Sequence, residues 1–161
     1  MSGQFLTIDG RQVEYCLLPG ASRKPSLVML HEGLGCVGLW QDFSQKLNNS
    51  FGRTVFSYSR FGYGKSSAVS LPRPLDYHSE EALCWLSKVL DCASIRDCVL
   101  VGHSDGASIA LVYAGSVPDP RIKGLVLLAP HVKAETKTIN QIKAISEERE
   151  SSIIRNKLRR Y

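Results

Sequence analysis

Short apolar runs alternate with amphipathic stretches along most of this chain. Four of the runs have the length and apolar content of strands buried on both faces: 26–31, 54–58, 98–101 and 124–129. Apolar residues at helical spacing between them predict helices over 39–48, from 79 onward and from 105 onward. Strands that alternate with helices form parallel sheets through crossover connections, so the expected fold class is α/β.

The two ends of the chain depart from this alternation. Asp9-Gly10 separates two short strand patterns, 5–8 and 13–17, and therefore predicts an antiparallel hairpin at one side of the sheet. Beyond Lys133, isoleucines at helical spacing predict amphipathic helices outside the sheet. We therefore expect a core over residues 1–131 and a helical cap or lid segment over 132–161.

Composition narrows the class of protein. A chain of 161 residues, 43% hydrophobic and 22% charged, suits one soluble domain. No apolar run reaches the roughly 18 residues of a membrane span, and the N-terminus lacks a secretory pattern. The five cysteines are odd in number and have no Cys-x-x-Cys spacing, so we expect buried thiols in a reducing cytoplasm and no metal site.

The net charge of +5 lies mostly beyond residue 131. A solvated helix face explains it better than nucleic acid or an acidic membrane, because no aromatic residues are interleaved with the basic ones. Gly62–Ser66 lacks the first glycine of a phosphate-binding loop at the required spacing. We expect no cofactor and no nucleic-acid or membrane partner.

Gly102-His103-Ser104-Asp105-Gly106 is the most informative stretch of the chain. It fits Gly-x-Ser-x-Gly, follows an apolar run and precedes a helical pattern. In that setting it predicts a nucleophile elbow, with Ser104 in a strained conformation at the apex of a sharp turn. An ordinary Gly-rich turn is the alternative. His103 is expected to point beneath the turn into packed side chains.

A second glycine-bearing loop supports acyl-transfer chemistry, which needs backbone donors for the oxyanion. His31–Gly35 follows the first parallel strand, and its glycines allow a backbone N–H to face a cleft. The N–H of Asp105, directly after the serine, would be the second donor.

Several segments together resemble the N-terminal part of the α/β-hydrolase-fold superfamily. They are Leu30–Gly35, Trp40, Ser59–Ser66, Val101–Gly106 and Leu127–His131. The resemblance is closest to the single-domain subfamily that holds carboxylesterases, proline-iminopeptidase-like enzymes and C–C bond hydrolases. It implies a mostly parallel sheet with flanking helices and the start of a cap.

The resemblance also implies site residues. Ser104 would be the nucleophile, and the N–H groups of Gly33 and Asp105 would form the oxyanion hole, with Leu34 as an alternative to Gly33. Glu32, Leu34 and His131 are possible cleft-lining residues. Glu32 replaces a glycine common in the family, Ser59 replaces an Asp and Phe61 replaces an Arg.

The catalytic acid and histidine of the triad are not found in this chain. The family order is serine, acid, histidine, but the last aspartate is Asp119 and the only histidine after Ser104 is His131. We expect the chain to stop about 100 residues short of the usual single-domain length.

Three functions stay open. The first is a serine hydrolase that acts through an acyl-enzyme on a small-molecule ester, amide or related acyl or C–C bond. The others are a non-catalytic ligand-binding module and an inactive truncated product. The run 125–128 would lack its neighbouring strand, and the exposed apolar edge predicts self-association.

Overall fold

The computed structural model describes residues 4–21, 23–131 and 140. The chain divides into two compact units, 1–130 and 131–161. The predicted cap segment 132–161 lies outside the described residues except for Asn140.

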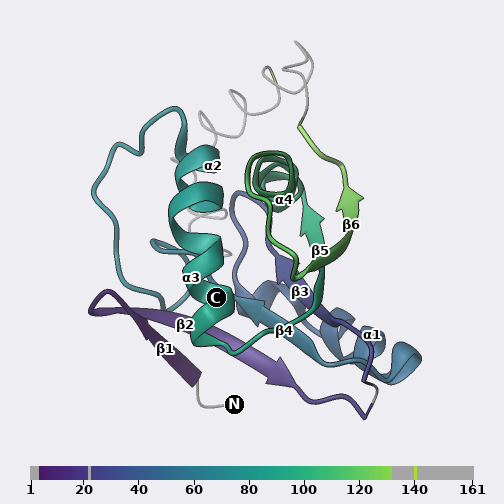
Figure 1. Cartoon of the computed structure of the whole chain (residues 1–161). Helices are drawn as coiled ribbons and strands as arrows, with labels where there is room; N and C mark the ends of the chain where they lie inside the picture. The colour runs from purple at the N-terminus through teal and green to yellow at the C-terminus, as the bar shows by residue number, and fades with distance from the viewer. Residues whose placement is uncertain (1–3, 22, 132–139, 141–161) are drawn as a thin grey trace. The chain divides into compact units, whose positions relative to one another are not determined.

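A mixed six-stranded sheet forms the centre of this unit (Figure 1). Its strands are β1 (Gln4–Ile8), β2 (Arg11–Leu18), β3 (Ser26–Leu30), β4 (Val55–Tyr58), β5 (Cys98–His103) and β6 (Ile122–Leu128). Their order is β1-β2-β4-β3-β5-β6. β1 and β2 run antiparallel, as do β2 and β4, whereas the β3–β4, β3–β5 and β5–β6 pairs are parallel. The expected α/β class, with an antiparallel hairpin beside a mostly parallel sheet, is confirmed.

The Asp9-Gly10 turn joins β1 to β2 as predicted. Both residues have positive φ, 49° and 76°. This conformation is typical of the tight hairpin turn whose twist matches the flanking strands, and Asp-Gly adopts it readily.

The predicted helix over 39–48 is wrong in its bounds. A 3-10 turn, η1 (Val37–Trp40), comes first, and helix α1 then covers Phe43–Phe51. Gln41 has a φ of 48°, which breaks the helical path between them. Gly52, with a φ of 60°, ends α1 in the left-handed conformation common at helix C-termini.

The helix predicted from residue 79 begins at Tyr77 and has an irregular centre. It consists of α2 (Tyr77–Glu80), a π-helical segment η2 (Glu81–Leu86) and α3 (Ser87–Cys92). Helix α4 (Asp105–Ser116) begins where the sequence predicted it.

Apolar side chains cover both faces of the sheet. The larger cluster joins residues of β3, β5 and β4 to α4 and to the helix over 77–92, and includes Leu30, Leu86, Leu100 and Ile109. The smaller cluster lies on the α1 face and includes Leu27, Met29 and Val101. None of the helices in the described part of the chain has the length and apolar character that a bilayer crossing requires.

The expectation of buried cysteines holds only in part. All five are free thiols; Cys36 and Cys98 are buried, but Cys84 and Cys92 are exposed. Both exposed cysteines lie in the helix over 77–92, where the apolar spacing alone did not separate them from the buried positions.

Candidate functional site

Ser104 lies at the junction of β5 and α4. Its backbone angles are φ 53° and ψ −114°, outside the helical and extended regions. The Ser104 N–H donates to the Leu128 carbonyl at 2.8 Å, and its own carbonyl accepts the N–H groups of Ala107 and Ser108. The serine is therefore the apex of a strand–turn–helix held by β6 on one side and by the first turn of α4 on the other.

Glycines two residues before and after Ser104 make this turn possible. A Cβ atom on Gly102 would lie 2.5 Å from the backbone of Ala107. A Cβ atom on Gly106 would overlap the carbonyl oxygen of Leu30 on β3. Neither position has room for a side chain, because backbone passes both within contact distance.

The loop after β3 reaches the start of α4. Its turn is closed by the Gly35 N–H, which donates to the Glu32 carbonyl at 3.0 Å. A Cβ atom on Gly33 would lie 2.9 Å from Oδ2 of Asp105, so these two residues are in contact. As the first residue of α4, Asp105 has a backbone N–H with no acceptor inside the helix. The structure thus brings together Gly33 and Asp105 beside Ser104.

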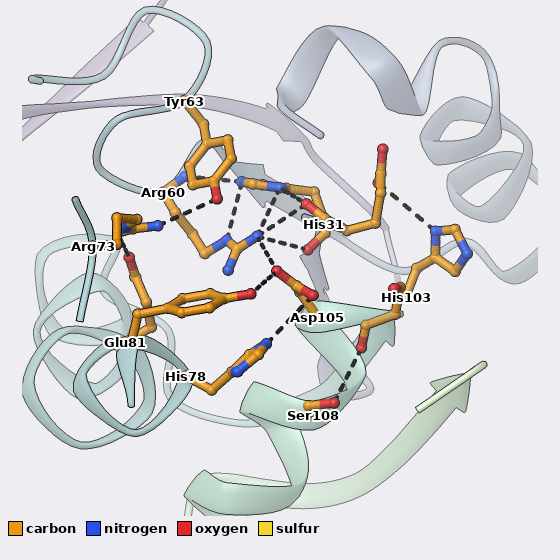
Figure 2. Close-up of polar contacts among 12 residues, drawn as sticks. His31, Arg60, Tyr63, Arg73, His78, Glu81, His103, Asp105 and Ser108 are labelled. Carbon is orange, nitrogen blue, oxygen red and sulfur yellow. Dashed lines mark hydrogen bonds and ion pairs between the residues drawn. The ribbon is translucent and has the colours of Figure 1, made fainter. Parts of the chain in front are cut away.

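The Asp105 carboxylate points into a cluster of polar side chains that the sequence analysis missed. The Tyr77 hydroxyl donates to Oδ2 at 2.5 Å, His78 Nε2 lies 3.3 Å from Oδ1, and Arg60 Nη2 lies 3.7 Å from Oδ2 (Figure 2). Burial alone would raise the pKa of Asp105, but the contacts with His78, Tyr77 and Arg60 outweigh it and lower the pKa to about 2. Asp105 is therefore a firmly ionised carboxylate.

Arg60 lies at the centre of this cluster with no exposed side-chain surface (Figure 2). Its Nη2 donates to the carbonyl oxygen of Glu32 at 2.9 Å. The guanidinium also lies over the Tyr63 ring, 4.8 Å from its centroid. Nη1 is buried and has no hydrogen-bond partner among the described residues.

His31 is buried against Arg60 and is neutral. Its Nε2 accepts the backbone N–H of Arg60 at 3.1 Å, so Nδ1 carries the proton and donates to the Glu32 carbonyl at 2.7 Å. Burial and the adjacent Arg60 charge lower the pKa of His31 to about 3. Both ring nitrogens are thus engaged.

A second ion pair extends the cluster away from Ser104. Arg73 Nη2 donates to Glu81 Oε1 at 2.7 Å, and Glu81 is buried. Burial raises the pKa of Glu81, with Arg60 and Arg73 opposing the shift. The one signal in the sequence was Arg60 itself, a charged residue directly after an apolar strand; residues 73–81 follow no motif.

Ser59 occupies a position where many family members have Asp. Here the carboxylate of Glu14, on β2, contacts it instead. The Ser59 hydroxyl donates to Glu14 Oε2 at 2.8 Å and accepts the Val37 N–H at 2.9 Å. The end of β4 is therefore tied to β2 and to the segment that follows the Gly33 loop.

The remaining predicted site residues are Glu32, Leu34 and His131, with His103 beside the serine. Glu32 Oε2 lies 3.7 Å from His103 Nδ1, and the His103 side chain is 45% exposed, so its predicted burial beneath the turn is wrong. The His103 ring faces the Glu32 carboxylate rather than packed apolar side chains, which the strand pattern did not indicate. Leu34 is 55% exposed. His131 is the first residue of the second unit.

Residues 4–21, 23–131 and 140 contain no group of three or more His, Cys, Asp or Glu side chains arranged to hold a metal ion.

Solved structures share this fold. A carboxylesterase from the thaumarchaeon Nitrososphaera gargenis superposes with a TM-score of 0.71 at 20% identity, covering 92% of this chain and 54% of its own. The thioesterase domain from the curacin biosynthetic pathway superposes with a TM-score of 0.67 at 28% identity, covering 92% and 53%.

Curated relatives are longer than this chain. Human (lyso)-N-acylphosphatidylethanolamine lipase is 32% identical over 112 residues, 70% of this chain and 32% of the lipase. Proline iminopeptidase from Lactobacillus helveticus is 28% identical over 118 residues, 73% of this chain and 40% of the peptidase. The chain thus spans between about a third and two fifths of the length of these relatives.

The alpha/beta hydrolase fold family matches residues 25–154, most of the chain. That match includes β3, the Gly33 loop and the Ser104 turn. The chain belongs to the α/β-hydrolase fold family.

Proposed function

We propose that Ser104 is the nucleophile of a serine hydrolase that acts on a small-molecule ester, amide or related acyl or C–C bond. The backbone N–H groups of Gly33 and Asp105 would form its oxyanion hole. The observation that carries the proposal is the positive φ of Ser104 at a turn where Gly33 contacts Asp105. A strained serine beside two candidate donors is the arrangement that acyl transfer requires.

In the proposed reaction, Ser104 Oγ attacks the substrate carbonyl carbon and loses its proton to a base. The carbonyl π electrons move to the oxygen, and the two N–H groups stabilise the resulting negative charge. As this intermediate collapses, the base passes the proton to the leaving group, the bond to that group breaks, and an acyl-enzyme remains. Water then attacks the acyl carbon, and the acid product leaves as Ser104 regains its proton.

Three described histidines are poor candidates for this base. His31 is neutral with both nitrogens engaged, His78 pairs with Asp105, and His103 pairs with Glu32. A serine without a base is a weak nucleophile, although an oxyanion hole alone retains some rate enhancement. The engaged histidines favour a second candidate, a non-catalytic ligand-binding module or inactive product that keeps the turn and the donors.

The small-molecule substrate and a cytoplasmic location belong to the same proposal. Five free thiols support a reducing compartment. Substrate identity depends on cap residues outside the described part of the chain.

Labelling by a fluorophosphonate probe tests the function. We expect the probe to label the wild-type protein at Ser104, and Ser104→Ala to abolish labelling. The matched control is Ser70→Ala, which removes an exposed hydroxyl elsewhere and should label like the wild type. No labelling in a version extended to the length of its relatives would refute a catalytic serine. Binding of an ester analogue without turnover would then support the ligand-binding module.

A further inference from the structure

We propose that Arg60 is a positioning residue that orients the Gly33 N–H and couples it to Asp105. The proposal rests on the proposed function, because it concerns the two donors of the oxyanion hole. Its structural part, the orientation of one peptide plane by one guanidinium, can be measured without any activity.

A single peptide joins Glu32 to Gly33 and carries the N–H of the proposed oxyanion hole. This peptide is planar and trans, so its C=O and its N–H point in opposite directions. Three buried groups donate to the carbonyl: Arg60 Nη2 at 2.9 Å, His31 Nδ1 at 2.7 Å and the backbone N–H of Gly35 at 3.0 Å. Because Arg60 binds the carbonyl, the Gly33 N–H points away from Arg60. The proposed oxyanion would lie on that side.

The same guanidinium lies near the side chain of the residue that would supply the second donor. Arg60 Nη2 lies 3.7 Å from Oδ2 of Asp105, whose backbone N–H begins α4. One nitrogen thus lies between a carbonyl of the Gly33 loop and the carboxylate at the start of the helix (Figure 2). Gly33 and Asp105 come from separate elements, and Arg60 contacts both.

Arg60 is itself held in place. Its backbone N–H donates to His31 Nε2, and its Nε lies 3.4 Å from the same atom. Tyr63 covers one face of the guanidinium, and the side chain has no exposed surface. A group fixed in this way transmits its position to the carbonyl that it binds.

The burial of Arg60 is costly. Nη1 has no partner among the described residues, and a buried unpaired donor loses its hydration without compensation. An apolar side chain of similar size would avoid that loss. The cost favours a functional role over a purely structural one.

The competing explanation is that Arg60 only neutralises Asp105. Two substitutions separate the explanations. Arg60→Lys keeps the positive charge but loses Nε, which lies 3.4 Å from His31 Nε2, so its ammonium is not fixed between the carbonyl and the carboxylate. Arg60→Met removes both contacts at similar volume. Arg73→Met is the matched control, because it removes a neighbouring arginine that pairs with Glu81 and does not contact the Glu32 carbonyl.

The first measurement is the backbone order parameter and N–H orientation of Gly33, by ¹⁵N relaxation and residual dipolar couplings on the full chain. We expect an order parameter of about 0.85 in the wild type and in Arg73→Met, and below about 0.6 in Arg60→Met. Arg60→Lys should also reorient or loosen Gly33. The second measurement is the rate of fluorophosphonate labelling, which should fall about 100-fold in Arg60→Met and remain unchanged in Arg73→Met.

The outcomes are separable. A mobile Gly33 in the wild type, or an unchanged Gly33 in Arg60→Lys or Arg60→Met, overturns the positioning role. Gly33 could lose order in Arg60→Met while even the wild type, extended to the length of its relatives, is not labelled. That result would support the positioning role and refute the proposed hydrolase function. If Arg60→Met does not fold, the Gly33 N–H orientation in the wild type and in Arg60→Lys tests the positioning role.

Discussion

Gly106, in the first turn of α4, lies against the carbonyl oxygen of Leu30 at the end of β3. A Cβ atom at position 106 would overlap that oxygen, and neither backbone can move without shifting the sheet or the helix. Gly106→Ala should therefore destabilise the protein by about 3 kcal/mol, at the upper end of overpacking costs. Urea unfolding measures the change.

The matched control for Gly106→Ala lies in the same helix. A Cβ atom on Gly115 would meet nothing within 4 Å. Gly115→Ala should stabilise the protein by about 0.5–1 kcal/mol, because alanine is the better helix former. Equal effects at the two positions would contradict the close approach of α4 to β3.

Ser104 has a backbone conformation that non-glycine residues rarely adopt. At φ 53° and ψ −114° the strain costs about 1–3 kcal/mol. Ser104→Gly should relieve most of it and raise the free energy of unfolding by about 1 kcal/mol after the entropy of the unfolded glycine is subtracted. Ser104→Ala retains the strain and serves as the control, with stability near that of the wild type. A Ser104→Gly variant less stable than Ser104→Ala would refute a strained turn.

His31 makes stability depend on pH. Its pKa falls from 6.5 to about 3 on folding, so between these values the unfolded state binds a proton that the folded state does not. Its contribution is complete above pH 6.5 and decreases as the pH falls toward 3. The free energy of unfolding should drop by about 1.4 kcal/mol between pH 7.5 and 5.5 from this residue alone.

Urea unfolding at both pH values, with His31→Gln beside the wild type, checks this dependence. The variant has no ionisable ring and should lose the His31 share of the drop. An NMR titration of the His31 ring gives an independent reading. A ring that takes up its proton near pH 6.5 in the folded protein would show that it is not buried against Arg60.

Apolar side chains remain exposed where β6 meets the α1 face. Val126 and Leu128 are 45% and 41% exposed, and they line an apolar pocket of about 360 Å³ with residues of α1 and β5. We expect self-association through this face and the strand edge, because unpaired apolar edges pair with other chains. Sedimentation velocity over a wide concentration range measures it.

Val126→Lys places a charge on this edge and should lower the association. Leu75→Lys is the matched control, since Leu75 is fully exposed on a loop away from β6. A wild-type chain that stays monomeric and unfolds cooperatively would contradict the expected association, whatever the variants do.

Patterns confined to a few neighbouring residues predicted the local structure well. Asp9-Gly10 set the hairpin, because its conformation depends on those two residues and the strands beside them. The Gly-x-Ser-x-Gly stretch likewise placed Ser104 between β5 and α4. The helix near 39–48 was misplaced, because the break at Gln41 leaves no mark in the spacing of apolar residues.

The polar cluster around the Asp105 carboxylate could not be predicted in this way, because the sheet brings its members together. Arg60 meets His31, 29 positions away, and Tyr77 meets Asp105, 28 positions away. These contacts exist because the parallel strands β3, β4 and β5 end at the same edge of the sheet in a fixed register. The segments that follow the three strands therefore lie side by side. Periodicity and turn chemistry act over a few residues, so the chain alone specified its strands, its hairpin and the serine turn. Which charges share a buried space is a property of long-range packing, and only the folded sheet decided that Arg60 lies between Glu32 and Asp105.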